Sequence, residues 1–363
     1  MAGNPGSEVA MRRSLARAAI AAFAVIGAVA SPPLTAAPAG AAAATLGGAA
    51  AATGRYFGAA VGASHLGEAP YAAVLDREFT SVTPENEMHW DAVEPVRGQF
   101  NFTPADAIVA HAQSKGMRVR GHSLVDSPHT AWTGNLLTAQ DTYQALTAHI
   151  AAVAGHFRGK IHSWDVVNEA FADSGGVRPG LFQRRLGDSY IETAFRAARA
   201  ADPAARLCLN DYGIEDPAAA KTRGVLAMVK DFKTRGVPID CVGLESHFTA
   251  TTPVPAGYAQ TIAQFAALGV EVQITELDIE GSGAAQAQAY GRAVTACVSV
   301  PRCTGVTVWG VTDRYSWRSG GTPLPFDRDY NKKQAYYSAL SAFAICGAPA
   351  AAADGAVAAA RRC

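Results

Sequence analysis

The chain has 363 residues with 31 basic and 31 acidic side chains, so its formal net charge is zero; 17% of it is charged and 49% hydrophobic. A chain with no net positive charge lacks the charge excess typical of nucleic-acid-binding proteins, and its hydrophobic content is too high for an intrinsically disordered protein. The length allows one large domain or two ordinary ones.

Alanine is concentrated at both ends of the chain, and the N-terminal end has the order of regions found in export signals. Three arginines precede the apolar run 18–30, which is too short to span a bilayer. We expect a signal peptide over residues 1–43, cleaved between Ala39 and Ala44, with Met11 as an alternative start of translation. An alanine-rich disordered arm is the competing interpretation. Export predicts a secreted, extracellular protein without membrane contact after cleavage.

Eight apolar, β-branched runs typical of strands follow in chain order. They cover residues 56–61, 79–83, 117–120, 161–167, 206–209, 241–244, 270–274 and 305–309. Between several of them lie helix patterns, two of which we expect to start with an N-cap and a proline, at Thr103–Pro104 and Asp216–Pro217. Glycines mark expected helix ends at Gly116, Gly236 and Gly269.

Alternating strands and helices over about 300 residues predict the α/β class with a parallel sheet, and eight units predict a (β/α)8 TIM barrel. We place this single catalytic domain at residues 44–345, followed by an alanine-rich tail or linker remnant at 346–363. A doubly wound sheet is the competing architecture. It would normally carry a glycine-rich phosphate loop, and neither G-x-G-x-x-G nor G-x-x-x-x-G-K-[ST] occurs.

Six cysteines are expected to pair in an exported protein, although spacing alone permits 15 connectivities. No C-x-x-C and no His/Cys pair at metal-ligand spacing occurs, so we expect neither a metal site nor a cofactor. A metal-dependent barrel hydrolase is an alternative class. Its common motifs H-x-H and H-E-x-x-H are both missing from the sequence.

Polar residues close most of the predicted strands, and barrel enzymes place their chemistry at the C-terminal ends of strands. These residues are Glu85, Asn86, His122, Asn168, Glu169, Asn210, Asp211, Glu245, His247, Glu276, Asp278 and, as an aromatic end, Trp309. Carboxylates or amides close five of the eight runs. We therefore expect acid/base chemistry at one rim of the barrel.

Two motifs stand out, W-D-V-V-N-E at 164–169 and I-T-E-L-D-I at 274–279, each with a glutamate directly after an apolar strand. In the fourth and seventh strands of a closed barrel, Glu169 and Glu276 face each other across the mouth. Glycoside hydrolysis requires such a facing carboxyl pair. A lone glutamate at a strand end would more often cap a helix or form a surface ion pair, but two together favour the catalytic interpretation.

Residues 54 to 345 resemble the glycoside hydrolase family 10 endo-β-1,4-xylanases, especially secreted actinobacterial members. The carriers are G-R-Y-F-G at 54–58, T-P-E-N-E-M at 83–88, W-D-V-V-N-E-A-F at 164–171, N-D-Y at 210–212, S-H-F at 246–248, I-T-E-L-D-I at 274–279 and V-W-G-V-T-D-R-Y-S-W-R at 308–318. These motifs occur in order over nearly the whole domain.

The resemblance implies endo-cleavage of xylan by retaining double displacement, with Glu169 as general acid/base and Glu276 as nucleophile. For that outcome the two carboxyl groups should lie about 5 to 5.5 Å apart. Asn168 would bind the sugar 2-hydroxyl, and His247 would hydrogen-bond Glu276 and hold it ionised. Asp278 would support this group of residues.

The resemblance also assigns the walls of the cleft and the disulfides. Trp309 and Trp317 would form an aromatic wall for a sugar ring, with a buried core position as the alternative for Trp309. The glycone subsites would be lined by Glu85, Asn86 and His122. The disulfides would join Cys208 to Cys241 and Cys297 to Cys303, with Cys346 and Cys363 outside the pattern. The partner would be a neutral polysaccharide, bound by a monomer.

The chain departs from the family pattern at several positions: the segment 126–132 is one residue shorter, Ser127 stands in place of a histidine, and four further positions differ. His89 stands in place of a lysine, Asp126 of a tryptophan, Gly213 of an asparagine and Glu245 of a glutamine. We hypothesise that His89 and Asp126 face each other as a replacement polar pair that contacts the sugar. We expect Glu245 to raise the pKa of the neighbouring carboxyl groups and to move the acidic limb of the pH–rate profile upward relative to a Glu245→Gln variant.

These departures leave two other functions open. The same mechanism could act on a different β-linked glycan or on decorated xylo-oligosaccharides. A weakly active or non-catalytic xylan-binding relative is the second alternative, although a binding module has no need for both Glu169 and Glu276.

Overall fold

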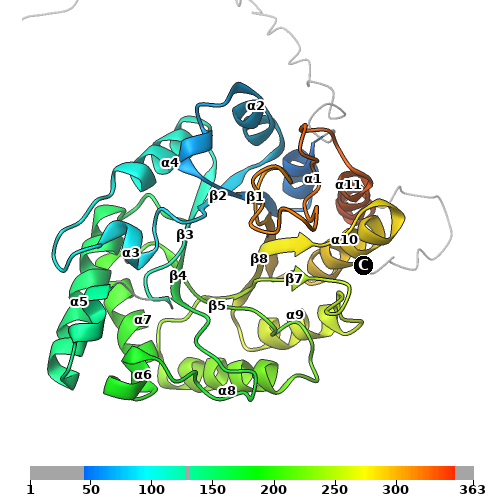
Figure 1. Ribbon diagram of the computed structural model, residues 1–363. Helices are drawn as coiled ribbons and strands as arrows, with labels where there is room; N and C mark the ends of the chain where they lie inside the picture. Colours follow the sequence, from blue (N-terminus) through cyan, green and yellow to red (C-terminus); the bar gives the residue numbers. More distant parts are fainter. Residues whose placement is uncertain (1–44, 127–130, 348–363) are drawn as a thin grey trace, which may run out of the picture. The chain divides into compact units, whose positions relative to one another are not determined.

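Parallel strands follow one another in chain order around a closed ring, because the sheet order β6-β5-β4-β3-β2-β1-β9-β8 is completed by pairing of β6 with β8 (Figure 1). The computed structural model describes residues 45–126 and 131–347. The ring consists of β1 (Tyr56–Val61), β2 (Ser81–Pro84), β3 (Arg118–Gly121), β4 (Ser163–Asn168), β5 (Arg206–Asp211), β6 (Cys241–Leu244), β8 (Glu271–Ile279) and β9 (Cys303–Val308). The predicted (β/α)8 barrel is confirmed.

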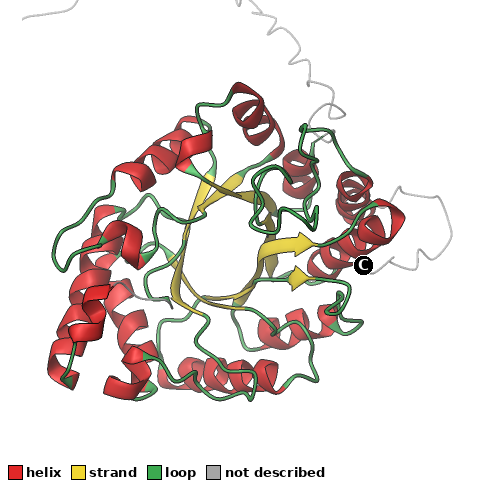
Figure 2. Cartoon of the chain, viewed as in Figure 1, coloured by secondary structure: helices red, strands yellow, loops and turns green. Residues whose placement is uncertain are grey.

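Helices surround this ring on its outside (Figure 2). They are α1 (Leu46–Ala52), α2 (Ala69–Glu78), α3 (Trp90–Val93), α4 (Thr103–Ser114), α5 (Ala139–His156), α6 (Leu181–Leu186), α7 (Ser189–Ala201), α8 (Ala220–Arg235), α9 (Tyr258–Ala267), α10 (Gly283–Val298) and α11 (Gln334–Gly347), with 3-10 turns η2 (Ala63–His65) and η3 (Ala131–Asn135). In α7 the buried Tyr190, Ala194 and Ala198 recur every fourth residue, so one face of this helix packs inward.

The strands β1 and β6 have the predicted bounds, whereas β8 runs five residues further than expected, to Ile279. Its second half pairs with a two-residue strand, β7 (His247–Phe248), in the register His247 opposite Asp278. Glu276 and Asp278 therefore lie within β8, and the expectation that Glu276 follows the strand is wrong. The extra pairing with β7 keeps this polar half of the strand extended.

Two predicted helix starts also differ from the structure. The N-cap of α4 is Phe102, so Thr103 already belongs to the helix. The carboxylate of Asp216 accepts a hydrogen bond from the Ala218 backbone N–H at 2.9 Å, and α8 begins only at Ala220. Aspartate commonly binds the backbone two residues on, which forms a turn in place of a helix cap. The expected end of α8 is confirmed at Gly236, whose φ of 68° is the left-handed conformation that glycine adopts easily.

Both disulfides implied by the resemblance are present. Cys208–Cys241 joins β5 to β6 between directly paired residues, and Cys297–Cys303 joins the end of α10 to the start of β9. The side chains of Cys346 and Cys363 lie outside the described part of the chain.

The predicted signal peptide at 1–43 also lies outside the described residues, as does the tail beyond residue 347. Helix α11 continues to Gly347, so the first two residues assigned to the tail are helical. Among the residues described, none of the helices has both the length and the apolar character needed to cross a membrane.

Candidate active site

The C-terminal ends of the strands open into a cavity of about 900 Å³. It is lined by ten of the predicted site residues: His89, His122, Asp126, Asn168, Glu169, Glu245, His247, Glu276, Trp309 and Trp317. Three other predicted residues, Glu85, Asn86 and Asp278, are not part of this lining. The predicted convergence of strand-end side chains on one rim is thus largely seen in the fold.

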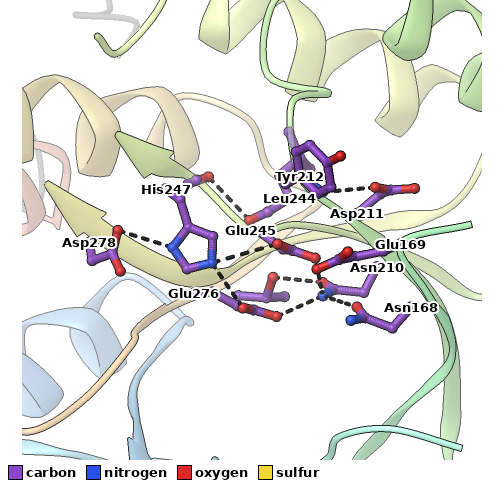
Figure 3. A network of polar contacts seen from close by, with 12 residues as sticks. Asn168, Glu169, Asn210, Asp211, Tyr212, Leu244, Glu245, His247, Glu276 and Asp278 are labelled. Carbon is purple, nitrogen blue, oxygen red and sulfur yellow. Dashed lines mark hydrogen bonds and ion pairs between the residues drawn. The ribbon is translucent and has the colours of Figure 1, made fainter. Parts of the chain in front are cut away.

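Glu276 is held by fixed donors on both of its carboxylate oxygens (Figure 3). Its Oε1 accepts a hydrogen bond from Asn210 Nδ2 at 2.8 Å, and its Oε2 lies 3.1 Å from His247 Nε2. The side chain is buried. Because a buried carboxylate is stable only when it is hydrogen-bonded and paired, this arrangement orients an anion toward the cavity.

His247 connects Glu276 to Asp278, a residue of β8 that contacts the other ring nitrogen of the histidine (Figure 3). Its Nδ1 is 3.0 Å from Asp278 Oδ1, an ion-pair contact whose angle departs from hydrogen-bond geometry. Burial lowers the pKa of His247, but its contacts with Asp278 and Glu276 outweigh burial and raise it to about 10. His247 is therefore an imidazolium that faces a carboxylate on each side. Asp278 also accepts a hydrogen bond from Trp317 Nε1 at 2.7 Å.

Glu169 follows the last residue of β4 and has a more open setting than Glu276. Its side chain is 31% exposed, and Oε2 lies 3.8 Å from Arg178 Nη1. Its backbone φ of 52° is in the left-handed region, and its N–H bonds the Asn210 carbonyl at 2.9 Å. That conformation costs a non-glycine residue about 1–3 kcal/mol and is typical of functional sites. The strained backbone aims this carboxyl into the cavity from the opposite side of the rim.

Asn210 is the residue that connects the whole group; the sequence placed it at the rim but assigned it no role in the site. Its Nδ2 lies 2.8 Å from Asn168 Oδ1, 2.8 Å from Glu276 Oε1 and 3.3 Å from Glu245 Oε1. Its Oδ1 accepts a hydrogen bond from Thr275 Oγ1 at 2.7 Å. The sequence did contain a signal, since Asn210 closes the apolar fifth strand.

His122 is buried beside a charge pair inside the barrel. Its Nδ1 lies 3.0 Å from Asp165 Oδ2, and Arg120 pairs with the same carboxylate through its Nε at 2.8 Å. Burial works against protonation, but Asp165 and Glu276 outweigh it and raise the pKa of His122. Asp165 was missed in the sequence, although a charged residue within an apolar strand must find a buried partner.

His89 and Asp126 do face each other, but without a hydrogen bond between them. His89 Nδ1 lies 3.9 Å from Asp126 Oδ2, which instead accepts from Ser123 Oγ at 3.1 Å. Burial, with His122 nearby, lowers the pKa of His89 to about 3. Asp126 is 7% exposed, and burial raises its pKa to about 7. The contact therefore joins a neutral imidazole to a carboxyl group that is half protonated near neutral pH, which is too weak for an ion pair.

Glu245 lies at the end of β6, almost fully buried between the other carboxyl groups. Its pKa is held well above the ordinary value, first by burial and then by Glu276 and Glu169. The raised pKa predicted for the neighbouring carboxyl groups is thus found on Glu245 itself, which favours its protonated form.

Aromatic side chains form one wall of the cavity. Trp309 is 8% exposed and lines the cavity, so it is both buried and available to a ligand. Trp317 is 56% exposed, with the Arg318 guanidinium 4.6 Å from its ring centroid. Gly213 lines the same cavity with a φ of 65°. Asparagine and glycine are the residues that tolerate this conformation best, which explains a glycine where the family has asparagine.

Other lining residues were not singled out from the sequence, among them Tyr212, Glu215 and Phe248. Tyr212 stands in the quoted N-D-Y motif and accepts a hydrogen bond from Arg178 Nη2 at 2.7 Å. Arg178 itself lies in the loop after β4, where no sequence pattern marks it.

One group of side chains has metal-ligand character: single atoms of Glu245, His247 and Glu276 lie within 4.8 Å of one another. Zinc and related ions bind the neutral imidazole through a ring nitrogen lone pair. His247 directs Nε2 toward Glu276 at 3.1 Å and Nδ1 toward Asp278 at 3.0 Å, so each of its ring nitrogens already faces a carboxylate. The absence of a metal site remains a prediction.

A closed parallel barrel with two carboxyl groups on opposite sides of a strand-end cavity defines the class of barrel glycoside hydrolases. Residues 45–342 match Glycosyl hydrolase family 10, and the chain belongs to that family. It is 41% identical to Endo-1,4-beta-xylanase 3 of Hypocrea jecorina over 285 residues. The aligned region covers 78% of this chain and 81% of that protein.

Three further comparisons agree with this assignment. Endo-1,4-beta-xylanase A of Phanerodontia chrysosporium is 41% identical over 297 residues, covering 77% of this chain and 72% of that protein. Among solved structures, xylanase 10B of Thermotoga maritima superposes with a TM-score of 0.80 at 36% identity, covering 84% of this chain and 99% of that one. Xylanase 10B of Thermotoga petrophila, crystallised with xylobiose, gives the same TM-score and identity.

Proposed function

We propose that this protein is an endo-1,4-β-xylanase that cleaves internal bonds of xylan by retaining double displacement. The observation that carries the proposal is the setting of Glu276, whose two oxygens face separate fixed donors, Asn210 Nδ2 and His247 Nε2. A nucleophile must stay ionised and aimed at the anomeric carbon. The relatives named as xylanases support the substrate, and the xylobiose complex of the Thermotoga petrophila enzyme supports binding of xylo-oligosaccharides.

In the first step a Glu276 oxygen attacks the anomeric carbon while Glu169 gives its proton to the departing glycosidic oxygen. The C–O bond to the leaving chain breaks, and a glycosyl ester forms on Glu276. In the second step Glu169, now ionised, takes a proton from water, which attacks the same carbon and releases Glu276. The more exposed position of Glu169 fits this exchange of protons with leaving group and water, whereas the buried position of Glu276 fits a nucleophile.

Glu169→Gln and Glu276→Gln variants test these roles. Both should lower kcat on xylan by about 10³-fold or more, because each removes an essential group. A 2,4-dinitrophenyl β-xylobioside needs no proton for departure, so Glu169→Gln should still release a first equivalent of dinitrophenol from it, and Glu276→Gln should not. Glu271→Gln is the matched control, since Glu271 lies at the opposite end of the same strand and pairs with Arg206 at 3.3 Å.

Trapping with a 2-fluoro-xylobioside followed by peptide mapping identifies the nucleophile directly. Label on Glu276 is expected, and label elsewhere or none overturns the retaining assignment. The same experiment tests the sugar specificity, because a fluorinated cellobioside should react more slowly.

The polar surroundings of Asp126 favour a second candidate, the same chemistry on a different β-linked glycan or on decorated xylo-oligosaccharides. A buried carboxyl group and a neutral His89 offer hydrogen bonds to sugar hydroxyls where the family offers a lysine and an aromatic platform. Loss of the platform removes about 1–3 kcal/mol of apolar contact. Product analysis over xylan, decorated xylan and β-glucans decides between the two substrates. Xylan binding without release of reducing sugar would instead favour the non-catalytic relative.

The remaining features stay proposals. Export over a signal peptide at 1–43 is supported by the two disulfides, which persist in oxidising compartments. The catalytic domain is placed at 44–345, supported by the family match over residues 45–342. A monomer is expected. Resemblance to secreted actinobacterial members remains a prediction, since the two curated relatives named above are fungal.

A further inference from the structure

Glu245 is a carboxyl group at this rim for which the mechanism has no role. It occupies a position where the family has an uncharged glutamine, and it sits beside the nucleophile. Its backbone carbonyl accepts the Glu276 N–H at 3.0 Å, which fixes the two residues on neighbouring strands.

The donors around this pair are too few to serve two anions. Asn210 Nδ2 carries two hydrogens but faces three acceptors, of which Glu245 Oε1 is the furthest at 3.3 Å. His247 Nε2 carries one hydrogen and lies 3.1 Å from Glu276 but 3.6 Å from Glu245. Both donors are thus closer to Glu276. Glu245 is left with weaker contacts to each of them.

The charges that face Glu245 also oppose its ionisation. Four carboxyl groups approach it from four segments: Glu276 on β8, Glu169 after β4, Asp211 on β5 and Glu215 in the loop after β5. Within the described part of the chain, the cation paired with Glu245 is His247 on β7, which is already shared between Glu276 and Asp278. Lys221 of α8 pairs with Asp211 at 2.8 Å and compensates that group instead.

We propose that Glu245 and Glu276 act as a pair that holds one proton, with the proton on Glu245, and that Glu245 is a positioning residue for the nucleophile. While it is protonated, Glu245 leaves the hydrogens of Asn210 and His247 to Glu276. When it loses the proton, two adjacent anions compete for those hydrogens, and the nucleophile loses its fixed orientation. The kinetic part of this inference rests on the proposed function.

The raised pKa of Glu245 agrees with this geometry and predicts where the effect appears. A pair that interacts this strongly loses its protons in two separate steps. Glu245 is the member of the pair that keeps its proton to higher pH, so its ionisation affects the basic limb of the pH–activity profile. The change that the sequence predicts for the acidic limb is therefore expected on the basic limb instead.

The first test is stability, which needs no substrate. A carboxyl group whose pKa is raised in the folded state stabilises below its unfolded pKa, and that contribution is lost as pH rises through the folded value. Glu245→Gln should therefore gain Tm over the wild type between pH 5 and pH 9, by about 2 °C for each kcal/mol. Glu78→Gln is the control. Burial raises the pKa of Glu78, but Arg77, Tyr336 and Lys332 outweigh burial and lower it. The Tm difference between Glu78→Gln and the wild type should therefore stay constant from pH 5 to pH 9.

The second test is kinetic and uses kcat/KM for 2,4-dinitrophenyl β-xylobioside, whose leaving group needs no proton, so that ionisation of Glu169 does not contribute. The wild type should lose up to about tenfold per pH unit on the basic side. Glu245→Gln should lack this limb, so the variant-to-wild-type ratio rises with pH, while the acidic limbs stay close together.

A stability gap that does not change with pH shows that Glu245 holds no proton and overturns the proposal. If the Tm difference widens with pH but the ratio of kcat/KM between variant and wild type stays flat or falls, the positioning role is overturned. If the variant does not fold, titration of ¹³C-labelled glutamate carboxyl groups in the wild type decides, with Glu85→Gln and Glu215→Gln variants to assign the two other glutamates whose pKa is raised. A remaining carboxyl group titrating above pH 7 supports the pair, and its absence overturns it. Failure of the proposed function would instead appear as no turnover at any pH, with the stability result unchanged.

Discussion

Replacing Asp278 with asparagine should change the charge of His247 without changing the shape of the site. Asp278 is fully buried, 3.0 Å from His247 Nδ1, and accepts the Trp317 N–H at 2.7 Å. Asparagine retains an acceptor for Trp317 but loses the negative charge. Removing an opposite charge at this range lowers the pKa of a histidine by about 1–3.

The magnitude follows from the structure. The pKa of His247 is raised from 6.5 to about 10, and at 1.36 kcal/mol per pH unit this corresponds to about 5 kcal/mol of coupling between protonation and folding. Because the pKa of His247 is raised in the folded state, its protonation stabilises the fold fully below pH 6.5, and this stabilisation is lost as pH rises toward 10. The stability gap between wild type and Asp278→Asn should therefore be widest below pH 6.5 and narrow toward pH 10.

NMR titration of the histidine rings measures this directly. The wild-type His247 ring should titrate near pH 10, and the variant ring nearer to neutral pH. His149 is an internal control, since it is buried beside Glu94 away from this cavity and should not respond. A wild-type His247 that titrates near 6.5 would refute the idea that Asp278 and Glu276 hold it protonated.

Two further predictions concern stability. The pKa of Asp126, raised from 3.8 to about 7, corresponds to about 4 kcal/mol that is lost as pH rises from 3.8 through 7. The Tm of Asp126→Asn relative to the wild type should therefore rise between pH 4 and pH 8. The same Tm difference at both pH values would contradict this prediction. Loop lengths of 33 and 6 residues predict losses of about 4 kcal/mol for Cys208→Ala/Cys241→Ala and about 2 for Cys297→Ala/Cys303→Ala. Urea unfolding at one pH should rank the two double variants in that order.

The barrel could be predicted because most of its strands are buried and contain short hydrophobic runs that stand out in the sequence. The same logic failed for the second half of β8, where threonine, glutamate and aspartate alternate with apolar residues. Such a segment resembles a loop until its partners are known. In the fold, Glu276 and Asp278 are satisfied by donors from two other strands, β5 and β7.

The candidate site could be predicted at the level of residue types but not of contacts. Strand-end position was enough to mark Glu169, Glu276 and His247. It could not mark Asn210 as the shared donor, because that depends on the register that brings Asn168 opposite Asn210. Nor could it indicate that the His89 ring stays neutral, since this follows from burial.

Charge compensation separates Glu245 from two other buried acids of the barrel. Burial raises the pKa of Asp165, but Arg120 and His122 outweigh it and lower that pKa. Burial raises the pKa of Asp211 to about 6, and Lys221 at 2.8 Å offsets part of this cost of leaving water. A glutamate in place of the family's glutamine adds an acid without adding a cation. The least costly way to accommodate it is to keep its proton, which makes Glu245 an uncharged stand-in for glutamine until the pH is high enough to remove that proton.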